Sequence, residues 1–396
     1  MTTKLQTCTA GAGWKAAVLS AGLAMANLAC DTQTLAVKPD VADRNNLAGY
    51  IQTNLVSDGS VPGTATDLNL VNPWGLAFGP TSPAWVADNG TGLSTLYEGG
   101  DVQSLVVNIP APPSPGIASA SKPTGLVYNP TPGFVVSDGT NSGVARFIYS
   151  TETGAIAGWS ATVPPPAPSA QAFIAVDNST SGAIYKGLAL AGDISSTRLY
   201  ATDFHNRKVD VFDSNFAPIN LERQFVDPDL PLRFAPFGIA NINGFIYVTY
   251  AMQDDKGEDD VPGAGLGFVN VFTQDGVFVR RLISQGALNA PWGIALAPTN
   301  FGRFSQKLLI GNFGDGKINA FLPDSGLLHG TLQGADGNSI VIDGLWAIVF
   351  GNGAAKQAVN SLFFTAGPND EGNGLFGRID AANPGEADFS PVAVGD

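Results

Sequence analysis

The chain has 396 residues and a formal net charge of −14, and only 14% of its residues are charged, while glycine (48) and proline (27) are plentiful. This composition indicates turn-rich, all-β structure. An acidic chain without a cluster of Lys and Arg is repelled by phosphate backbones and anionic lipids, which argues against binding to nucleic acid or bulk attraction to a membrane.

The first 30 residues differ in character from the rest of the chain. Lys4 and Lys15 precede an apolar stretch, residues 16–29, that is too short to span a bilayer. This pattern is typical of a secretory signal. We therefore expect residues 1–30 to be a signal peptide and the protein to be exported to the periplasm, the extracellular space or the outer envelope.

The signal offers two alternatives for processing. Ala24-Met25-Ala26 fits a simple cleavage site, whereas Leu28-Ala29-Cys30 fits a lipoprotein signal in which Cys30 is acylated. Only acylation would attach the protein to a membrane. The other cysteine, Cys8, lies within the signal, so we expect no disulfide in the folded body.

Residues 31–47 are polar and unpatterned, and we expect them to form a flexible tether. Residues 50–56 then have the pattern of a strand. We expect this early strand to complete the last sheet of a single closed domain, residues 48–390, because such a clasp removes an open sheet edge.

A phrase of proline, a variable residue, glycine and a hydrophobic residue recurs along this domain. The glycine positions of the six copies are Gly75, Gly125, Gly187, Gly238 and Gly293, with Ala347 in the sixth; Tyr185 stands in place of the proline in the third copy and Leu345 in the sixth. They are separated by 50, 62, 51, 55 and 54 residues, a spacing that suits one four-stranded blade each. The sequence therefore predicts a six-bladed β-propeller with four-stranded antiparallel blades.

A second apolar run follows each copy and ends at a turn. These runs are residues 84–88, 134–138, 199–203, 246–250, 309–312 and 362–365. Apolar runs bounded by Asp, Asn or Gly predict buried strands that enter hairpins, so we interpret each run as the second strand of its blade.

The motifs resemble those of a known family. Residues 202–209 resemble the turn of an NHL-repeat blade, and residues 72–77, 247–251 and 311–316 resemble an uncharacterised bacterial family of extracytoplasmic β-propellers, some of which carry PEP-CTERM tails. The resemblance implies an NHL-like propeller and brings no established activity.

The residue between proline and glycine should face the central channel in every blade. In chain order these residues are Trp74, Thr124, Lys186, Phe237, Trp292 and Trp346. Since the last blade neighbours the first, the four aromatic residues should form one arc opposite Thr124 and Lys186. We take Trp74, Lys186, Phe237, Trp292 and Trp346 as candidate ligand-binding residues, because aromatic walls with a few polar groups suit a small molecule or sugar. The alternative is that the rings wedge between blades.

An acidic loop in blade four is the sharpest local anomaly. Its carboxylates are Asp254, Asp255, Glu258, Asp259 and Asp260. Crowded carboxylates repel one another, and Ca²⁺ is the first candidate to relieve that repulsion. The spacing is not that of an EF-hand, and a solvated acidic turn is the alternative.

Residues of the common catalytic machineries are scarce. The two histidines, His205 and His329, do not have metal-ligand spacing, and no G-x-S-x-G elbow occurs. We therefore expect a monomeric binding module for a small molecule, glycan or partner protein. The alternatives are a Ca²⁺-dependent hydrolase or lactonase, by analogy with gluconolactonase-type propellers, and a cell-envelope scaffold.

Overall fold

The computed structural model describes residues 49–113, 120–220 and 224–382. The predicted signal peptide, the tether and Cys30 lie outside this range. Within it the chain is all-β apart from two short 3₁₀ turns, Ser179–Ser181 and Gly302–Phe304. A search of the same residues finds no helix of sufficient length and apolarity to cross a membrane.

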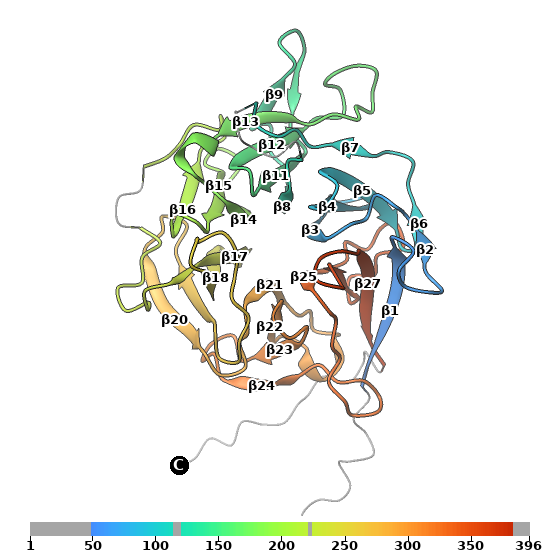
Figure 1. Cartoon of the computed structure of the whole chain (residues 1–396), viewed down its shortest axis with the longest axis vertical. Coiled ribbons are helices and arrows are strands. Elements are labelled where there is room, and N and C mark those ends of the chain that lie inside the picture. Colours follow the sequence, from blue (N-terminus) through green and yellow to red (C-terminus); the bar gives the residue numbers. More distant parts are fainter. Residues whose placement is uncertain (1–48, 114–119, 221–223, 383–396) are drawn as a thin grey trace, which may run out of the picture. The chain divides into compact units, whose positions relative to one another are not determined.

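Six antiparallel sheets surround a central axis as the blades of a propeller (Figure 1), as predicted. Blade one contains β3 (Pro73–Phe78), β4 (Ala84–Asp88), β5 (Leu93–Glu98), β6 (Asp101–Val102) and β7 (Val107–Asn108). Blade two contains β8 (Pro123–Tyr128), β11 (Phe147–Thr151), β12 (Ala155–Trp159) and β13 (Phe173–Asp177). Blade three shows three strands among the described residues, β14 (Tyr185–Ala191), β15 (Arg198–Asp203) and β16 (Lys208–Phe212).

The second half of the ring repeats this plan. Blade four contains β17 (Phe234–Ile242), β18 (Phe245–Met252), β19 (Phe268–Phe272) and β20 (Phe278–Ser284). Blade five contains β21 (Pro291–Leu296), β22 (Leu308–Asn312), β23 (Ile318–Phe321) and β24 (Leu328–Thr331). Blade six contains β25 (Leu345–Phe350), β26 (Leu362–Ala366), β27 (Leu375–Ala381), β1 (Tyr50–Ser57) and β2 (Ala65–Thr66).

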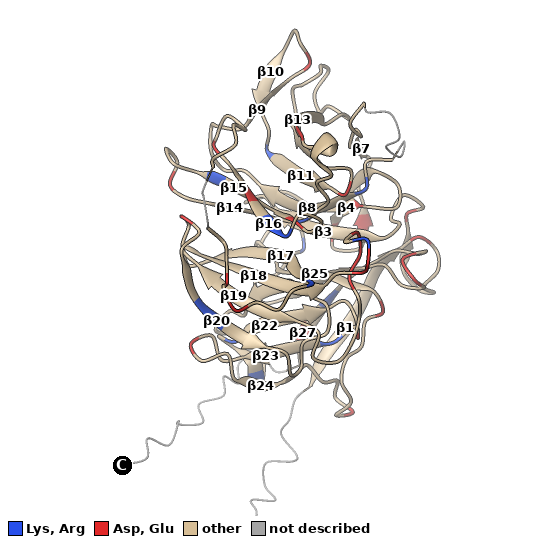
Figure 2. Ribbon diagram, turned by 60° about the vertical axis from the view of Figure 1, so that its left-hand side comes forward, with Lys and Arg blue, Asp and Glu red and all other residues tan. Residues whose placement is uncertain are grey.

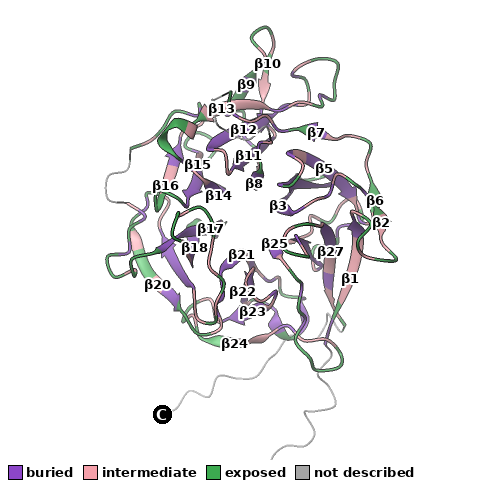
Figure 3. Ribbon diagram, in the orientation of Figure 1, coloured by how far each residue is buried: buried purple, intermediate pink, exposed green. Residues whose placement is uncertain are grey.

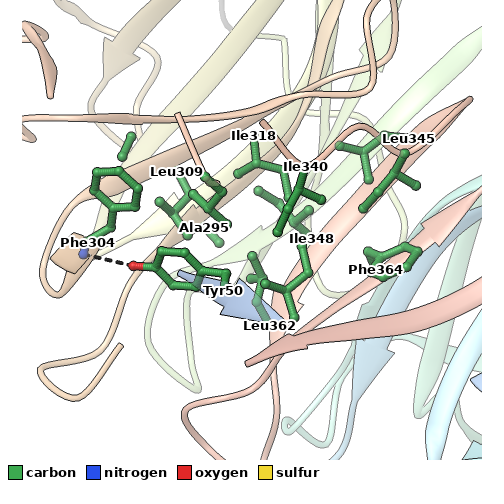
Figure 4. Packing of buried hydrophobic residues seen from close by; sticks show 14 of the residues in the cluster. Tyr50, Ala295, Phe304, Leu309, Ile318, Ile340, Leu345, Ile348, Leu362 and Phe364 are labelled. Atoms are coloured by element: carbon green, nitrogen blue, oxygen red, sulfur yellow. Dashed lines mark hydrogen bonds between the residues drawn. The ribbon is translucent and has the colours of Figure 1, made fainter. Parts of the chain in front are cut away.

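The ring is closed by the early strand, which confirms the expected clasp. Strand β1 pairs antiparallel with β27 in blade six. The hydroxyl of Tyr50 donates a hydrogen bond to the carbonyl of Phe301 at 2.9 Å and accepts one from the amide of Phe304 at 3.0 Å (Figure 4). The clasp is therefore tied both to the last blade and to blade five.

One strand assignment from the sequence is wrong. The second strand of blade two is β11, which is fully buried and pairs with the inner strand β8. Residues 135–137 form β9 (Val135–Ser137), which pairs with β10 (Ser142–Val144) in a hairpin inserted between β8 and β11. Both outer residues of β9 are exposed, so its apolar run follows the pattern of a half-buried hairpin and not of a blade interior.

The recurring glycines have a steric reason. A Cβ atom on Gly187 would lie 2.7 Å from the carbonyl oxygen of Phe237, and one on Gly293 would lie 2.7 Å from that of Trp346. On Gly238 it would overlap the carbonyl oxygen of Trp292. Only glycine therefore lets the inner strand of one blade approach the backbone of the next this closely.

Hydroxyl groups join neighbouring blades at the same level. The hydroxyl of Thr202 accepts a hydrogen bond from the amide of Gly187 and donates one to the carbonyl of Phe237, both at 2.7 Å. In blade six, Thr365 accepts from Ala347 at 3.1 Å and donates to the carbonyl of Trp74 at 2.6 Å. The inner strands, which pack between neighbouring blades, are buried, while the outermost strands are more exposed (Figure 3).

The close approach predicts that Gly238→Ala destabilises the propeller. The added methyl group must displace the carbonyl of Trp292, and overpacking of this kind costs about 1–3 kcal/mol. We expect the midpoint of urea unfolding to fall with little change in slope. Gly100→Ala is the matched control, because the nearest atom to its Cβ is 3.7 Å away. Equal midpoints for the two variants would contradict this explanation of the repeat.

Candidate functional site

The aromatic residues predicted to form an arc meet in the central channel. Trp74 stacks on Trp346 with ring centroids 3.5 Å apart. It also makes edge contacts with Trp292 at 6.1 Å and with Phe237 at 6.4 Å. Blades one and four face each other across the ring (Figure 1), so the contact between Trp74 and Phe237 crosses the channel. The arc exists, but its rings fill the channel instead of lining an open rim; we call these four residues the aromatic plug.

Lys186 is the polar counterpart of the plug. Only 1% of its side chain is exposed, and its Nζ lies 5.0 Å from the centroid of Trp74. The ammonium group forms ion pairs with Glu152 and with Asp259, the latter at 3.1 Å. Burial alone would lower the pKa of Lys186, but the two carboxylates outweigh it and raise the pKa above its usual value. Lys186 is therefore a fixed positive charge on one side of the plug.

A hydrogen-bonded network extends from this lysine around the channel. Glu152 accepts a hydrogen bond from Asn89 at 3.0 Å, and Asn89 accepts one from Asn72 at 3.4 Å. Asn72 also donates to Glu371 and accepts from the indole of Trp346 at 3.0 Å. The network thus joins plug residues to carboxylates from several blades.

The acidic loop of blade four reaches this network at one end only. Asp259 pairs with Lys186, while Asp255 pairs with Arg233 at 3.0 Å. Asp254 accepts hydrogen bonds from the amides of its own loop, including that of Glu258 at 2.9 Å. Across the described ranges, no three acidic, His or Cys side chains are placed to hold a metal ion. The Ca²⁺ site expected from the sequence stays a prediction.

Two further carboxylates carry perturbed pKa values. Desolvation, reinforced by the charges of Glu371 and Asp259, raises the pKa of Asp260 to about 7, although Lys186 opposes the shift. Desolvation and the charge of Glu152 also raise the pKa of Glu371. The Oδ2 atom of Asp260 is buried without a hydrogen-bond partner. Excess negative charge is therefore concentrated beside Lys186, and perturbed groups of this kind mark candidate functional sites.

The turn that presents Glu371 is conformationally strained. Asn369, Asp370 and Glu371 adopt φ values of 59°, 54° and 62° in succession. Each is a left-handed conformation that costs a non-glycine residue free energy, of order 1–3 kcal/mol for a sparsely populated backbone region. This turn connects β26 to β27, so the two strands of blade six hold it in this conformation.

We define the channel-mouth cluster as Lys186, Glu152, Asp259, Asp260 and Glu371 with Asn72 and Asn89. The sequence did not single out all of these residues for function. Lys186, Asp259 and Asp260 were candidates. Glu152 and the two asparagines were not, because each lies in a turn and is surrounded by ordinary turn residues. Their signal is spatial: carboxylates from different blades approach one buried lysine. Charged residues elsewhere lie largely in loops and at edges (Figure 2).

The fold and site define a six-bladed β-propeller with a filled channel and a charged cluster at one mouth. No protein-family model matches the sequence. The chain is 36% identical to the uncharacterised protein R648 of Acanthamoeba polyphaga mimivirus, over 82% of this chain and 78% of that protein. It is 32% identical to protein L690 of the same virus, over 85% and 87%. The chain therefore belongs to the family of these mimivirus proteins.

Several solved structures resemble the chain at low sequence identity. Virginiamycin B lyase from Staphylococcus aureus covers 84% of this chain with 98% of its own length, at 12% identity and a TM-score of 0.48. A glucose dehydrogenase covers 83% with 99% of its own length, at 14% identity and a TM-score of 0.46. These likenesses concern the fold alone. The six-bladed propeller that the resemblance implied is confirmed by the order of the sheets; the relatives found are viral and give no support to a bacterial setting or to PEP-CTERM tails.

The raised pKa of Asp260 predicts a pH dependence of stability. An unfolded Asp has a pKa of about 3.9, so between about pH 4 and pH 7 the folded protein holds a proton that the unfolded chain has released. The free energy of unfolding should therefore fall as pH rises through this window, by up to about 1.4 kcal/mol per pH unit from this group, and level off above it. Asp260→Asn should remove this component, as measured by urea unfolding at several pH values.

Asp255→Asn provides the matched control for that measurement. Asp255 belongs to the same loop, and its side chain is 98% exposed. In this variant the free energy of unfolding should change with pH as it does in the unmodified protein. If the pH dependence of the unfolding free energy is unchanged in Asp260→Asn, Asp260 is not the group that causes it.

Proposed function

We propose that this protein is an exported, monomeric binding module that takes an amine-bearing small molecule at the channel mouth. The observation that carries the proposal is the excess of carboxylates over cations in the channel-mouth cluster. Four carboxylates face the buried Lys186, and Lys122, whose Nζ lies 3.7 Å from Glu152, supplies the second positive charge of the site.

Carboxylate oxygens of the cluster that lack a hydrogen-bond donor favour a ligand that donates hydrogen bonds. Glu152 is occupied by Lys186 and Asn89, whereas Asp260 retains a buried oxygen without a partner. Asp259 is 74% exposed and lies at the solvent side of the cluster. An ammonium group entering beside Asp259 would offset the repulsion that raises the pKa of Asp260 and Glu371.

Phe313, which packs on the plug, supplies partly exposed aromatic surface. Phe313 stacks on Trp346 at 4.1 Å and is itself only partly buried. A cation over such faces gains attraction from the ring quadrupoles, as the ammonium of Lys186 already does over Trp74. Aromatic area with a few convergent polar groups is the usual composition of a small-molecule site.

A Ca²⁺-dependent hydrolase or lactonase is the second candidate. The buried, unpartnered oxygen of Asp260 beside Glu371 favours it, since a hard cation would satisfy that oxygen. Export, for either candidate, rests on the signal-like sequence of residues 1–30.

Calorimetric titration with matched pairs of compounds tests the proposal. Glucosamine should bind and glucose should not, and putrescine should bind more tightly than 1,4-butanediol, because each pair differs in its amine. Binding of putrescine, whose amines stay protonated throughout, should strengthen from pH 6 to pH 8 as Asp260 ionises, and should weaken with added salt. Equal affinity for the amine and its neutral partner would contradict the proposal.

Substitutions identify the groups involved. Glu371→Gln should lower amine affinity about tenfold, equivalent to about 1.4 kcal/mol, because it removes a charge from the cluster. Glu258→Gln, in the exposed part of the acidic loop, should leave affinity unchanged. A response to Ca²⁺ without a response to amines would favour the hydrolase.

A further inference from the structure

The channel contains a cavity on the side of the aromatic plug that faces away from the channel-mouth cluster. This cavity has a volume of about 560 Å³ and is lined by the second halves of the inner strands of all six blades. Trp292 belongs both to the plug and to the cavity lining, so it separates the cavity from the channel-mouth cluster. The volume is within the usual range for small-molecule sites.

One residue from each blade forms an aliphatic ring around this cavity. The members lie two positions after the plug position in each strand, all line the cavity, and are Leu76, Leu126, Leu188, Ile239, Ile294 and Ile348. The same repeated phrase therefore produces aromatic residues at one level of the channel and aliphatic residues at the next. The space remains open because aliphatic side chains, unlike indoles, do not reach across the ring, and because small residues such as Ala77, Ala189 and Ala240 lie between them.

The cavity lining contains no charged side chain among the described residues. Three of its polar side chains are engaged within the protein. Thr131 donates to Asn129 at 2.7 Å, Thr197 donates to the carbonyl of Asp193, and Asn241 donates to the carbonyl of Leu190 at 3.1 Å. An ionised ligand would lose its hydration without gaining a counter-charge, which is strongly unfavourable.

We propose that this cavity binds an uncharged, largely apolar small molecule. Such a ligand would replace water against aliphatic and aromatic walls, and burial of its apolar surface supplies the affinity. The site is distinct from the channel-mouth cluster in position and in chemistry, so the inference does not depend on the amine-binding proposal.

Two fluorescent probes of nearly the same shape provide the test. N-phenyl-1-naphthylamine is uncharged, whereas 1-anilinonaphthalene-8-sulfonate carries an added sulfonate. The uncharged probe should show saturable fluorescence enhancement with one molecule bound per chain, and the sulfonate should bind at least tenfold more weakly. Equal affinity for the two probes, or no saturable binding of the uncharged one, would overturn the proposal.

Substitutions place the probe in the cavity. Ile294 is only partly buried and lines the cavity, so Ile294→Trp should fill the space and lower the affinity for the uncharged probe at least tenfold. Ile294→Leu conserves volume and should change it less than threefold. Leu190→Trp, on a different blade, is the second filling variant if the first does not fold, as judged by circular dichroism. Unchanged affinity in a folded filling variant would show that the probe binds elsewhere.

Discussion

The close approach of neighbouring inner strands is the constraint on which the molecule depends. At four glycines of the repeated phrase, Gly75, Gly187, Gly238 and Gly293, the backbone of one blade lies against a carbonyl group of the next, and a threonine hydroxyl bridges neighbouring inner strands in blades three and six. The contacted carbonyl belongs to the residue between proline and glycine in the following blade, as for Gly238 and Trp292. Blade-to-blade packing and the position of each channel residue are consequently fixed by one contact.

This constraint divides the channel into two chemically different levels. The residue before the glycine reaches the axis, where Trp74, Phe237, Trp292 and Trp346 exclude solvent by packing on one another. The residue after it is aliphatic in all six blades and leaves space. Since both residues belong to the same short phrase, the plug and the cavity have to occur together, and a ligand on one side cannot pass to the other without displacing an indole.

The features that the sequence predicted are those set by local pattern. The repeated glycines gave the number of blades, and an early strand with no partner of its own implied the clasp that β1 forms with β27. The run at residues 134–138 misled because a half-buried hairpin and a buried strand have similar apolar content. The cluster was found only in part, because Asn72 and Glu371 are 299 positions apart and become neighbours only when the last blade closes on the first. The early strand implied that the ring closes, but no local pattern showed which turn residues of the first and last blades would meet.

Lys186 explains why carboxylates gather at this mouth of the channel. A buried ion pair generally contributes little net stability compared with apolar residues of similar volume, since both charges lose their hydration. An aromatic residue at this position would have completed the plug, as it does in four of the other blades. The lysine instead places a positive charge over Trp74, and Glu152 and Asp259 both pair with it. The turn that carries Glu371 adds a further carboxylate at the expense of three successive left-handed residues. Stability does not require this combination of a desolvated cation, surplus carboxylates and a strained turn, and for this reason we propose a binding role for the channel mouth.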